Sequence, residues 1–406
     1  MTTVQCCIAG GGPSGMMLGL LLARAGVQVA VLEKHSDFLR DFRGDTIHPS
    51  TLELLHELNL LEDFLRLPHQ EAVTLDAKIG DESFKVADFS GLPTHCRFIA
   101  FVPQWEFLNF IAARAQQYPN FKLMMGTEAT GLLRENGVIT GVETNSAVGA
   151  SAIRAILTIG ADGRYSSVRK AAGLEPIELG APMDVMWFRL SREPQDFAHT
   201  AGRLAAGSFF IQIDRDDYWQ CGYVIPKGTD EEIRKRGLGQ FRARLAELEP
   251  SLGDRVAELR DWEQIKLLTV QVNRLDRWYC PGLLCIGDAA HAMSPVGGVG
   301  INLAIQDAVA TANALTEPLR SGSLSIEHLA QVQHRRTWPT HTIQRIQLAI
   351  QSRVITRVLG AGGPINSPLA LRIAQRVPLI QRLIGRMIGL GPRPEHIKSR
   401  SVGAVE

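Results

Sequence analysis

The sequence predicts an α/β fold that opens with a parallel βαβ unit, carries an interleaved antiparallel sheet, and ends in a helical region. Three observations at the start of the chain predict the opening unit. Residues 4–9 are a short apolar run ending at Gly10, residues 16–25 are apolar on nearly every face, and residues 27–32 are a β-branched run ending at Glu33. A buried strand, a tight turn, a buried helix and a second strand in this order form a right-handed βαβ unit. The first 33 residues therefore indicate a Rossmann-like fold.

Composition and charge narrow the function classes. The 406 residues suffice for one large or two interleaved domains with a sizeable core. Lys plus Arg is 43 and Asp plus Glu is 42, so charge gives no argument for nucleic acid as a partner. No window reaches the roughly 18 uninterrupted apolar residues that a membrane-spanning helix needs, since Arg24 interrupts the longest early run. The N-terminus also lacks a basic segment followed by a cleavable apolar one, so we expect a cytoplasmic protein.

The cysteines predict neither a metal site nor a disulfide framework. They form no CxxC pair and have no neighbouring histidine pattern. We expect them to be small core residues without a catalytic role. They are Cys6, Cys7, Cys96, Cys221, Cys280 and Cys285.

Periodicity divides the chain into a discontinuous nucleotide-binding domain, an interleaved sheet domain and a C-terminal helical region. Residues 73–96 and 183–268 contain runs that alternate like half-buried strands, and we expect a mainly antiparallel sheet that roofs the cofactor. The nucleotide-binding domain would comprise residues 1–72, 97–182 and 269–340, and the helical region residues 341–406.

Helical periodicity marks four further stretches, and the pattern from about Leu324 onward is almost wholly helical. The four stretches are Pro49–Leu67, Gln104–Gln116, Asp230–Leu248 and Gly300–Leu315.

The turn after the first strand fits the GxGxxG pattern. It reads Gly10-Gly11-Gly12-Pro13-Ser14-Gly15. The first glycine of this pattern makes the tight turn, the second lets a pyrophosphate approach the backbone, and the third lets the helix pack closely. The pyrophosphate would lie at the helix N-terminus, where free N–H groups and the positive end of the dipole meet it. Glu33, which Lys34 follows, ends the second strand and is placed to accept a hydrogen bond from a ribose hydroxyl. These residues predict a dinucleotide, but this unit alone does not separate FAD from NAD.

Two later segments each join a strand to a turn with glycine and aspartate. Residues 153–159 run into Gly160-Ala161-Asp162-Gly163 and on to Arg169, and residues 283–286 run into Gly287-Asp288-Ala289-Ala290-His291. Residues 295–302, PVGGVGIN, then open another helix. With the GxGxxG turn, and in this order, these segments resemble those of the group A flavoprotein monooxygenases, the p-hydroxybenzoate hydroxylase class of aromatic hydroxylases. The resemblance implies FAD and a Rossmann-like FAD-binding fold of the p-hydroxybenzoate hydroxylase type.

The resemblance also implies roles for residues outside the glycine turn. Asp288 would accept a hydrogen bond from a ribityl hydroxyl, and Asp162 would help to order the flavin phosphates and the face where a nicotinamide docks. The backbone N–H groups of Gly300, Ile301 and Asn302 would hold the pyrimidine oxygen of the flavin and stabilise the charge of its reduced form. Arg43 matches the arginine that steadies the adenosine and pyrophosphate, and Gln104 matches the residue that reaches the ribityl chain. Either of these two side chains could instead be a solvated surface group.

Pro295 and Gly297 lie on the loop that the resemblance places between flavin and substrate, and we assign them to the catalytic loop. Pro295 would line the substrate side of the flavin ring. The proton acceptor is not identified. His291 could join a proton path, but a histidine just before a helix more often satisfies backbone groups, and we favour that interpretation.

The implied reaction is the hydroxylation of an electron-rich, usually phenolic, ring. NAD(P)H would reduce FAD, O2 would add to give a flavin hydroperoxide, and the distal oxygen would pass to the substrate. The chain has no second GxGxxG motif, so NADPH or NADH would visit transiently, and the choice between them stays open. The alternatives are an FAD-dependent reductase or dehydrogenase and a non-catalytic flavin-binding protein. A halogenase is disfavoured because residues 219–226, WQCGYVIP, lack the second Trp of the halogenase motif.

An apolar roof should exclude water, since the oxygenated flavin would otherwise collapse to peroxide. The candidate substrate-lining residues are Phe210, Gln212, Gln220, Gly222 and Tyr223. Because neighbours on a strand alternate faces, Gln220 and Gly222 share one side and Tyr223 the other, and the side that faces the flavin stays open. These strands show no clear arginine–tyrosine pair to grip a small benzoate, and Gly222 would leave space. We therefore favour a larger, less acidic substrate, such as a polycyclic phenol, quinone or quinolone.

The C-terminal stretch is basic and amphipathic. Residues 353–406 contain nine Lys or Arg and two Glu, a local charge of +7. Apolar residues between the arginines could mark a helix that lies on a membrane surface. We favour packing against the protein's own core or a second subunit, so a homodimer stays open and no membrane contact is expected.

Overall fold

The structure is a computed structural model of the chain. It describes residues 2–39, 46–80, 82–193, 195–196, 201–205, 207–215, 217–361, 372 and 375–402.

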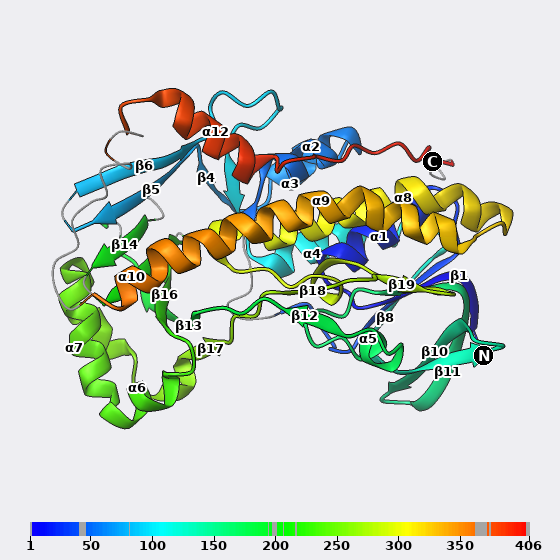
Figure 1. The fold of residues 1–406 in the computed structure, drawn as a ribbon, viewed down its shortest axis with the longest axis horizontal. Coiled ribbons are helices and arrows are strands. Elements are labelled where there is room, and N and C mark those ends of the chain that lie inside the picture. Colours follow the sequence, from blue (N-terminus) through cyan, green and yellow to red (C-terminus); the bar gives the residue numbers. More distant parts are fainter. Residues whose placement is uncertain are drawn as a thin grey trace.

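An eight-stranded, largely parallel sheet forms the centre of the nucleotide-binding part (Figure 1). Its path order is β19 (Tyr279–Cys280), β20 (Leu283–Cys285), β11 (Gly149–Gly160), β1 (Thr2–Ala9), β2 (Val29–Glu33) and β8 (Phe121–Met125). β1 is parallel to both β2 and β11, which confirms the predicted opening unit. An antiparallel extension, β9 (Thr127–Glu135) and β10 (Val138–Ser146), continues from β11.

Helix α1 (Pro13–Arg24) lies at the centre of the packing around this sheet. Pro13 begins it, where a missing N–H costs nothing, and ten of its residues are buried. A helix that is apolar on nearly every face has to be enclosed, and α1 packs against α4 (Gln104–Ala115) and α8 (Gly300–Ser321). The long helix α9 (Ile326–Ile350) in turn packs against α8.

Short elements connect the central sheet to the rest of the molecule. They are the sheet β3 (Thr46–Ile47), β7 (Ile99–Phe101) and β4 (Gln70–Ala72), the pair β12 (Pro176–Glu178) and β18 (Asn273–Leu275), and the helices α2 (Pro49–Glu57), α3 (Leu61–Leu65) and α5 (Ser167–Ala171).

A second sheet of seven strands forms the roof. Its order is β17 (Lys266–Leu268), β13 (Met183–Ser191), β16 (Tyr218–Pro226), β15 (Ser208–Asp214), β14 (Ala201–Ala205), β5 (Thr74–Ile79) and β6 (Glu82–Asp88). All neighbours are antiparallel except β14 and β5, which confirms the mainly antiparallel character. The sheet thus joins two segments that are far apart in the sequence.

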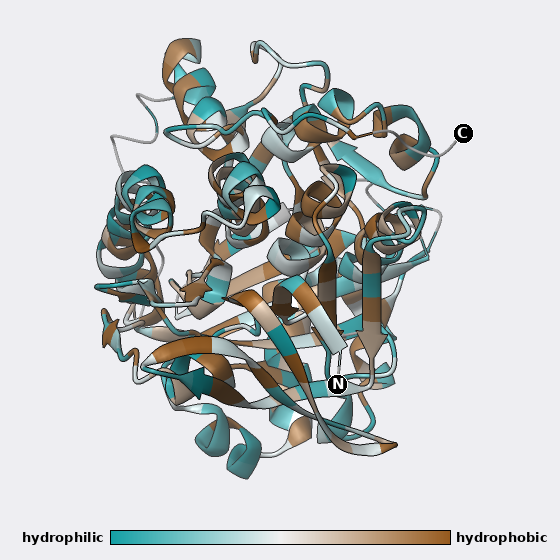
Figure 2. Ribbon diagram, turned by 90° about the vertical axis from the view of Figure 1, so that its right-hand side faces the viewer, coloured by the Kyte–Doolittle hydropathy of each residue, from teal (hydrophilic) through white to brown (hydrophobic). Residues whose placement is uncertain are grey.

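The roof sheet has two buried faces. The outer face packs on α6 (Asp230–Arg236), α7 (Leu238–Leu248) and the 3-10 turns at Pro250–Glu258 and Trp262–Gln264. The inner face packs with Val296, which precedes α8, and with α12 (Pro378–Gly389). Figure 2 shows hydrophobic strands gathered in the interior and more hydrophilic helices at the periphery.

Three helical predictions differ from the structure. The stretch 49–67 breaks into α2 and α3, with Asn59 at φ 58° between them, and the stretch 230–248 breaks at Gly237. α9 spans residues 326–350, so the predicted boundary at 340/341 falls inside a helix. After η5 (Gln351–Ile355), α10 (Thr356–Leu359) and α12, the described residues 391–402 contain no helix.

The basic helix α12 packs on the roof. Gly385 approaches the backbone of Asp88 on β6 so closely that an added Cβ would lie 2.1 Å from its carbonyl oxygen. Leu379 and Leu383 on the other side of α12 are exposed. Within the described residues, no helix is long and apolar enough to cross a membrane.

Candidate active site

The glycine turn forms a cradle at the carboxyl end of β1. Gly10 has φ 109°, and a Cβ there would lie 2.3 Å from the Ala161 carbonyl oxygen. A Cβ on Gly15 would lie 2.0 Å from the Gly10 carbonyl oxygen, so the third glycine lets α1 pack on the turn. At Gly12, by contrast, an added Cβ would meet nothing within 4 Å. Gly12 is also the N-cap of α1 and makes no side-chain cap, so the turn offers open space and backbone N–H groups to an anion.

Glu33 lies beside this cradle. One carboxylate oxygen accepts from the Gly11 N–H at 3.1 Å, and the other accepts from the His35 N–H at 3.1 Å. The carboxylate is therefore oriented at the end of β2, where a ribose bound to the cradle would reach it. Lys34 is exposed, while Ser14 is buried in the first turn of α1.

The turn after β11 uses its aspartate as a helix cap. Asp162 accepts from the hydroxyls of Ser166 and Ser167 and from the Val168 N–H, so its carboxylate orders the start of α5. Arg169, also buried, donates to the carbonyl oxygens of Ala289 and Arg164. Arg169 thus holds the turn after β11 to the turn after β20, which follows it by more than a hundred residues.

The turn after β20 packs directly on the cradle. Gly287 has φ 59°, and its Cα lies so close to α1 that a Cβ would come within 2.9 Å of the Ser14 hydroxyl. The carboxylate of Asp288 is 30% exposed and pairs with Arg164 at 3.2 Å. Asp288 is therefore accessible to a ligand that lies along the cradle, and Arg164 is a neighbour that the sequence pattern did not identify.

A buried ionic network supports this turn from behind. Asp307 of α8 accepts from the Gly287 N–H at 3.1 Å and lies 2.6 Å from His291 Nε2 and 2.9 Å from Arg336 Nε. Burial would raise the pKa of Asp307, but His291 and Arg336 hold it below its usual value. Arg336 also reaches Glu395 of the C-terminal segment at 3.3 Å.

The partner of His291 is thus a carboxylate, not the backbone groups that we favoured from the sequence. No local pattern in the sequence indicates this network, because Arg336 follows Asp307 by 29 residues on another helix. The side chains of His291, Asp307 and Arg336 are each at most 1% exposed, which makes the network a support for the turn.

The loop before α8 contains two glycines in the left-handed region, Gly297 at φ 79° and Gly298 at φ 63°. Asn302 has its side chain fully engaged: its oxygen accepts from the His48 N–H and the Thr51 hydroxyl, and its amide donates to the Thr46 carbonyl. The Asn302 side chain is thus held within the protein, which leaves its backbone N–H as the group suited to a ligand. The backbone N–H groups of Gly300, Ile301 and Asn302 stand in the first turn of α8, where an α-helix leaves its donors without internal partners.

Two predicted residues lie further from these turns. Gln104 is half-buried at the first position of α4, directly after β7. Arg43 lies outside the described residues, so its predicted role stays a prediction.

The five predicted substrate-lining residues divide between the two faces of the roof. Phe210 and Tyr223 belong to the outer cluster under α7. Gln212 alternates with the inner-face residues Ile211 and Ile213 on β15 and therefore points outward with Phe210. Gln220 and Gly222 alternate with outer-face residues of β16, so they face inward, toward the loop at Val296.

Contrary to the expectation from the sequence, Gly222 does not leave space for a substrate. The indole of Trp187, directly opposite on β13, fills that position, and a Cβ on Gly222 would lie 2.9 Å from the ring. The sequence did not identify Trp187, because only the β13–β16 register reveals this pairing. Arg189 of β13 does stack on Tyr218 of β16, with its guanidinium carbon 4.7 Å from the ring centre, but Arg189 is exposed. The expectation that no arginine–tyrosine pair grips a small benzoate stays a prediction.

The cysteines are small and mostly buried side chains, as expected from the sequence. All six cysteines are free, and five are buried. Burial raises the pKa of the Cys7 thiol to about 12, which leaves no reactive thiolate there. The described residues include no group of three His, Cys, Asp or Glu side chains suited to a metal ion.

These features define the class of protein. The open space at Gly12, the oriented carboxylate of Glu33, the exposed carboxylate of Asp288 and the first N–H groups of α8 are features that suit a dinucleotide. The fold and these features are those of a dinucleotide-binding protein.

Comparison with known proteins gives the family. A family model described as an FAD binding domain matches residues 3–345. The chain therefore belongs to this family, that of the group A FAD-dependent aromatic monooxygenases, and is an enzyme that uses FAD.

Relatives with known activities and structures agree. The chain is 32% identical to 6-methylpretetramide 4-monooxygenase of Streptomyces rimosus, over 97% of this chain and 94% of that protein. The structure of p-nitrophenol 4-monooxygenase PnpA from Pseudomonas putida has a TM-score of 0.75 at 20% identity and covers 95% of this chain and 97% of that one. PqsL from Pseudomonas aeruginosa, a probable FAD-dependent monooxygenase, has a TM-score of 0.73 at 22% identity, covering 88% and 97%. At these identities the two structures show the shared fold.

Proposed function

We propose that the enzyme hydroxylates a polycyclic phenolic or quinone-like substrate with NAD(P)H and O2. The observation that carries this proposal is the meeting of the free N-terminus of α8 with the apolar inner face of the roof, at the loop around Val296. The full-length similarity to a protein named for acting on 6-methylpretetramide supports a polycyclic substrate.

FAD, when bound, supplies the redox chemistry by accepting a hydride from NAD(P)H and activating O2 for transfer to a ring. The chain's own residues bind and orient it. The start of α1 at Gly12 would hold the pyrophosphate, Glu33 the ribose, and Asp288 the ribityl chain. The first N–H groups of α8 would stabilise negative charge on the flavin ring, since they lie at the positive end of a 22-residue helix.

The roof would exclude water and receive the substrate. Val185, Ile213 and Val224 of its inner face are buried and apolar. Among them, the indole nitrogen of Trp187 is buried without a hydrogen-bond partner in the described part of the chain. Buried indole N–H groups usually have an acceptor, so we assign this donor to a phenolic or carbonyl oxygen of the substrate. Gln220, which accepts from Arg215 at 3.1 Å, would mark the polar end of this face. Pro295 and Gly297 would line the opposite side.

The test is aerobic turnover of the purified holoenzyme with NADH and then NADPH, in the presence of 6-methylpretetramide or 1-naphthol. We expect bound FAD, and an increase in flavin reduction and O2 uptake with little peroxide when one of the phenols is added. FAD reduction that no phenol accelerates, together with anaerobic turnover of another acceptor, would instead identify a reductase. Bound FAD that neither nicotinamide reduces would identify a flavin-binding protein without this activity.

Trp187→Phe removes the indole N–H together with the distal ring of the indole, whose Cζ3 and Cη2 lie over Gly222. Trp338→Phe is the matched control because Trp338 is exposed on α9. We expect the first variant to raise the KM for the phenol about tenfold, as for one lost hydrogen bond, with FAD content unchanged. Equal KM values for both variants would show that Trp187 does not bind the substrate.

A further inference from the structure

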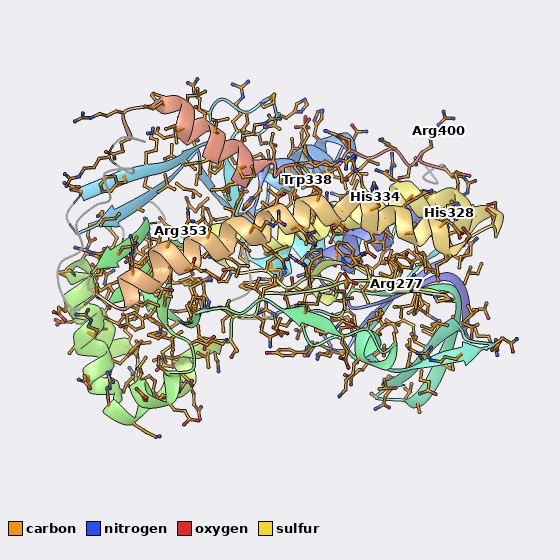
Figure 3. The ribbon with its side chains drawn as sticks, in the orientation of Figure 1. Arg277, His328, His334, Trp338, Arg353 and Arg400 are labelled. Carbon is orange, nitrogen blue, oxygen red and sulfur yellow. The ribbon has the colours of Figure 1, made fainter. Side chains whose placement is uncertain are left out.

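Three glutamines on one side of α9 and its continuation are buried. Gln344, Gln347 and Gln351 follow one another at intervals of three and four residues, which places them on one helix face, and each is at most 3% exposed. Figure 3 shows His334 and Trp338 on the outward side of the same helix. Buried amide groups are costly where they lack a partner. Among these three side chains, the Oε1 of Gln351 alone has no hydrogen-bond partner in the described part of the chain.

Gln347 is bound entirely to the loop before α8. Its amide nitrogen donates to the carbonyl oxygens of Ser294 and Val296, each at 2.9 Å, and its oxygen accepts from the Ser294 N–H at 3.2 Å. One side chain therefore satisfies three backbone groups on either side of Pro295.

The other two glutamines bind the same segment at Ala292 and at Ser294. The amide of Gln344 donates to the carbonyl oxygens of Asn273 and Ala292, at 2.8 and 3.2 Å. The amide of Gln351 donates to the Ser294 hydroxyl at 2.6 Å, and that hydroxyl accepts from the Val296 N–H. Gln351 also begins a π-helical turn, η5, and such turns are frequent at functional sites.

The loop itself has little regular structure to hold it. Beyond Ala292, which accepts from and donates to neighbours on β18, it contains one 3-10 turn with two glycines at positive φ. Ser294 is buried and Val296 half-buried, so their backbone polar groups need partners, and the glutamines supply them. The position of Pro295 and Val296 thus depends on a helix face that touches neither cradle turn.

We propose that Gln344, Gln347 and Gln351 are positioning residues that set the Pro295–Gly298 loop, and with it the start of α8, against the flavin ring. This rests on the proposed placement of the ring beside that loop, but not on the identity of the substrate. The loop leads within two residues into the first turn of α8, so a displaced loop moves the N–H groups that stabilise reduced flavin.

The test compares Gln347→Leu with Gln331→Leu, a matched change at an exposed position of the same helix. The holoenzymes are compared by the midpoint potential of bound FAD, by the FAD dissociation constant and by hydrogen exchange of the peptide that contains Ser294. For Gln347→Leu we expect a more negative potential, about a tenfold or larger rise in the dissociation constant and faster exchange, as three buried partners are lost. Gln331→Leu should behave as wild type in all three.

Gln347→Glu keeps the acceptor for the Ser294 N–H but loses the donors, so its potential should lie between wild type and Gln347→Leu. If Gln347→Leu does not fold, Gln351→Leu removes one bond only and should shift the potential in the same direction. An unchanged potential in the folded Gln347 variants, with faster exchange of the peptide, would show a purely structural role and overturn the proposal. Because these readouts need no aromatic substrate, they stand even if no phenol is hydroxylated.

Discussion

The cradle and the roof are both buried and both surround the proposed flavin path, yet they are built in different ways. In the cradle, backbone meets backbone: a Cβ on Gly10 would lie 2.3 Å from the Ala161 carbonyl oxygen. In the roof, side chain meets backbone: the Trp187 ring lies over Gly222, 2.9 Å from where its Cβ would be. A backbone contact at positive φ admits glycine alone, whereas a ring can move by part of an ångström. The cradle should therefore tolerate much less change than the roof.

The largest effect is expected at Gly10. Gly10→Ala places a Cβ against a carbonyl at φ 109°, so we expect loss of FAD and a destabilisation above about 4 kcal/mol. Gly12→Ala, where the space is open, should fold as wild type but bind FAD less tightly. Urea unfolding and the flavin content of purified protein measure both. A Gly10→Ala enzyme that retains FAD would contradict the claim that the cradle tolerates less change than the roof.

The network behind the cradle should show the next largest effect. Asp307→Asn leaves Arg336 buried without its full counter-charge, and breaking such a pair typically costs about 3–5 kcal/mol. We expect that loss in urea unfolding, accompanied by weaker FAD binding because the Gly287 turn is no longer held. Asp254→Asn at an exposed position is the control. A change below about 1 kcal/mol for Asp307→Asn would show that the network does not support the turn.

His48 connects the start of α8 to α12 and should make stability depend on pH. It is fully buried, its N–H is bonded to Asn302, and its ring Nδ1 lies 2.8 Å from the Ile388 carbonyl on α12. Burial lowers its pKa from 6.5 to about 4, outweighing the bond to Ile388. As the pH falls, His48 is therefore protonated in the unfolded state before it is protonated in the folded state. The contribution of neutral His48 to the free energy of unfolding is complete above pH 6.5 and is lost as the pH falls toward 4.

The loss should reach about 3 kcal/mol over that range. His48→Asn keeps a donor for Ile388 but does not titrate, so its unfolding free energy should fall less between pH 6.5 and 4. Equal acid dependence in wild type and variant would assign the titration to other groups.

The roof should show the smallest effect. Gly222→Ala pushes on the Trp187 ring and should cost about 1–3 kcal/mol, as overpacking does, with FAD content unchanged. Gly239→Ala, in an open position of α7, should be neutral or slightly stabilising. Loss of FAD from Gly222→Ala would show that roof and cradle are coupled more tightly than their contacts suggest.

The same contrast explains what the sequence could predict. Gly10, Gly12, Gly15 and Glu33 act through backbone conformation and fixed spacing, so a local pattern identifies them. Trp187 and Gly222 are 35 residues apart and meet only through the β13–β16 register. No local pattern contains that register, so the inward face of the roof could not be assigned.

Long-range side-chain networks were hidden for the same reason. Asp307 and Arg336, and the glutamines of α9, appear in the sequence as ordinary polar positions on amphipathic helices. They are buried because α9 packs against α8 and against the loop that precedes α8, which the sequence alone does not reveal. The helix breaks at Asn59 and Gly237 were missed because apolar spacing continued across them, while the backbone turned at positive φ.

The most direct test of the account is the fate of oxygen. The holoenzyme would be incubated with 6-methylpretetramide and NAD(P)H under ¹⁸O2, and the product analysed by mass spectrometry. We expect a hydroxylated product that carries one atom of ¹⁸O from O2. A product without ¹⁸O, or consumption of NAD(P)H that yields only labelled peroxide across the phenols and quinones tested, would contradict it.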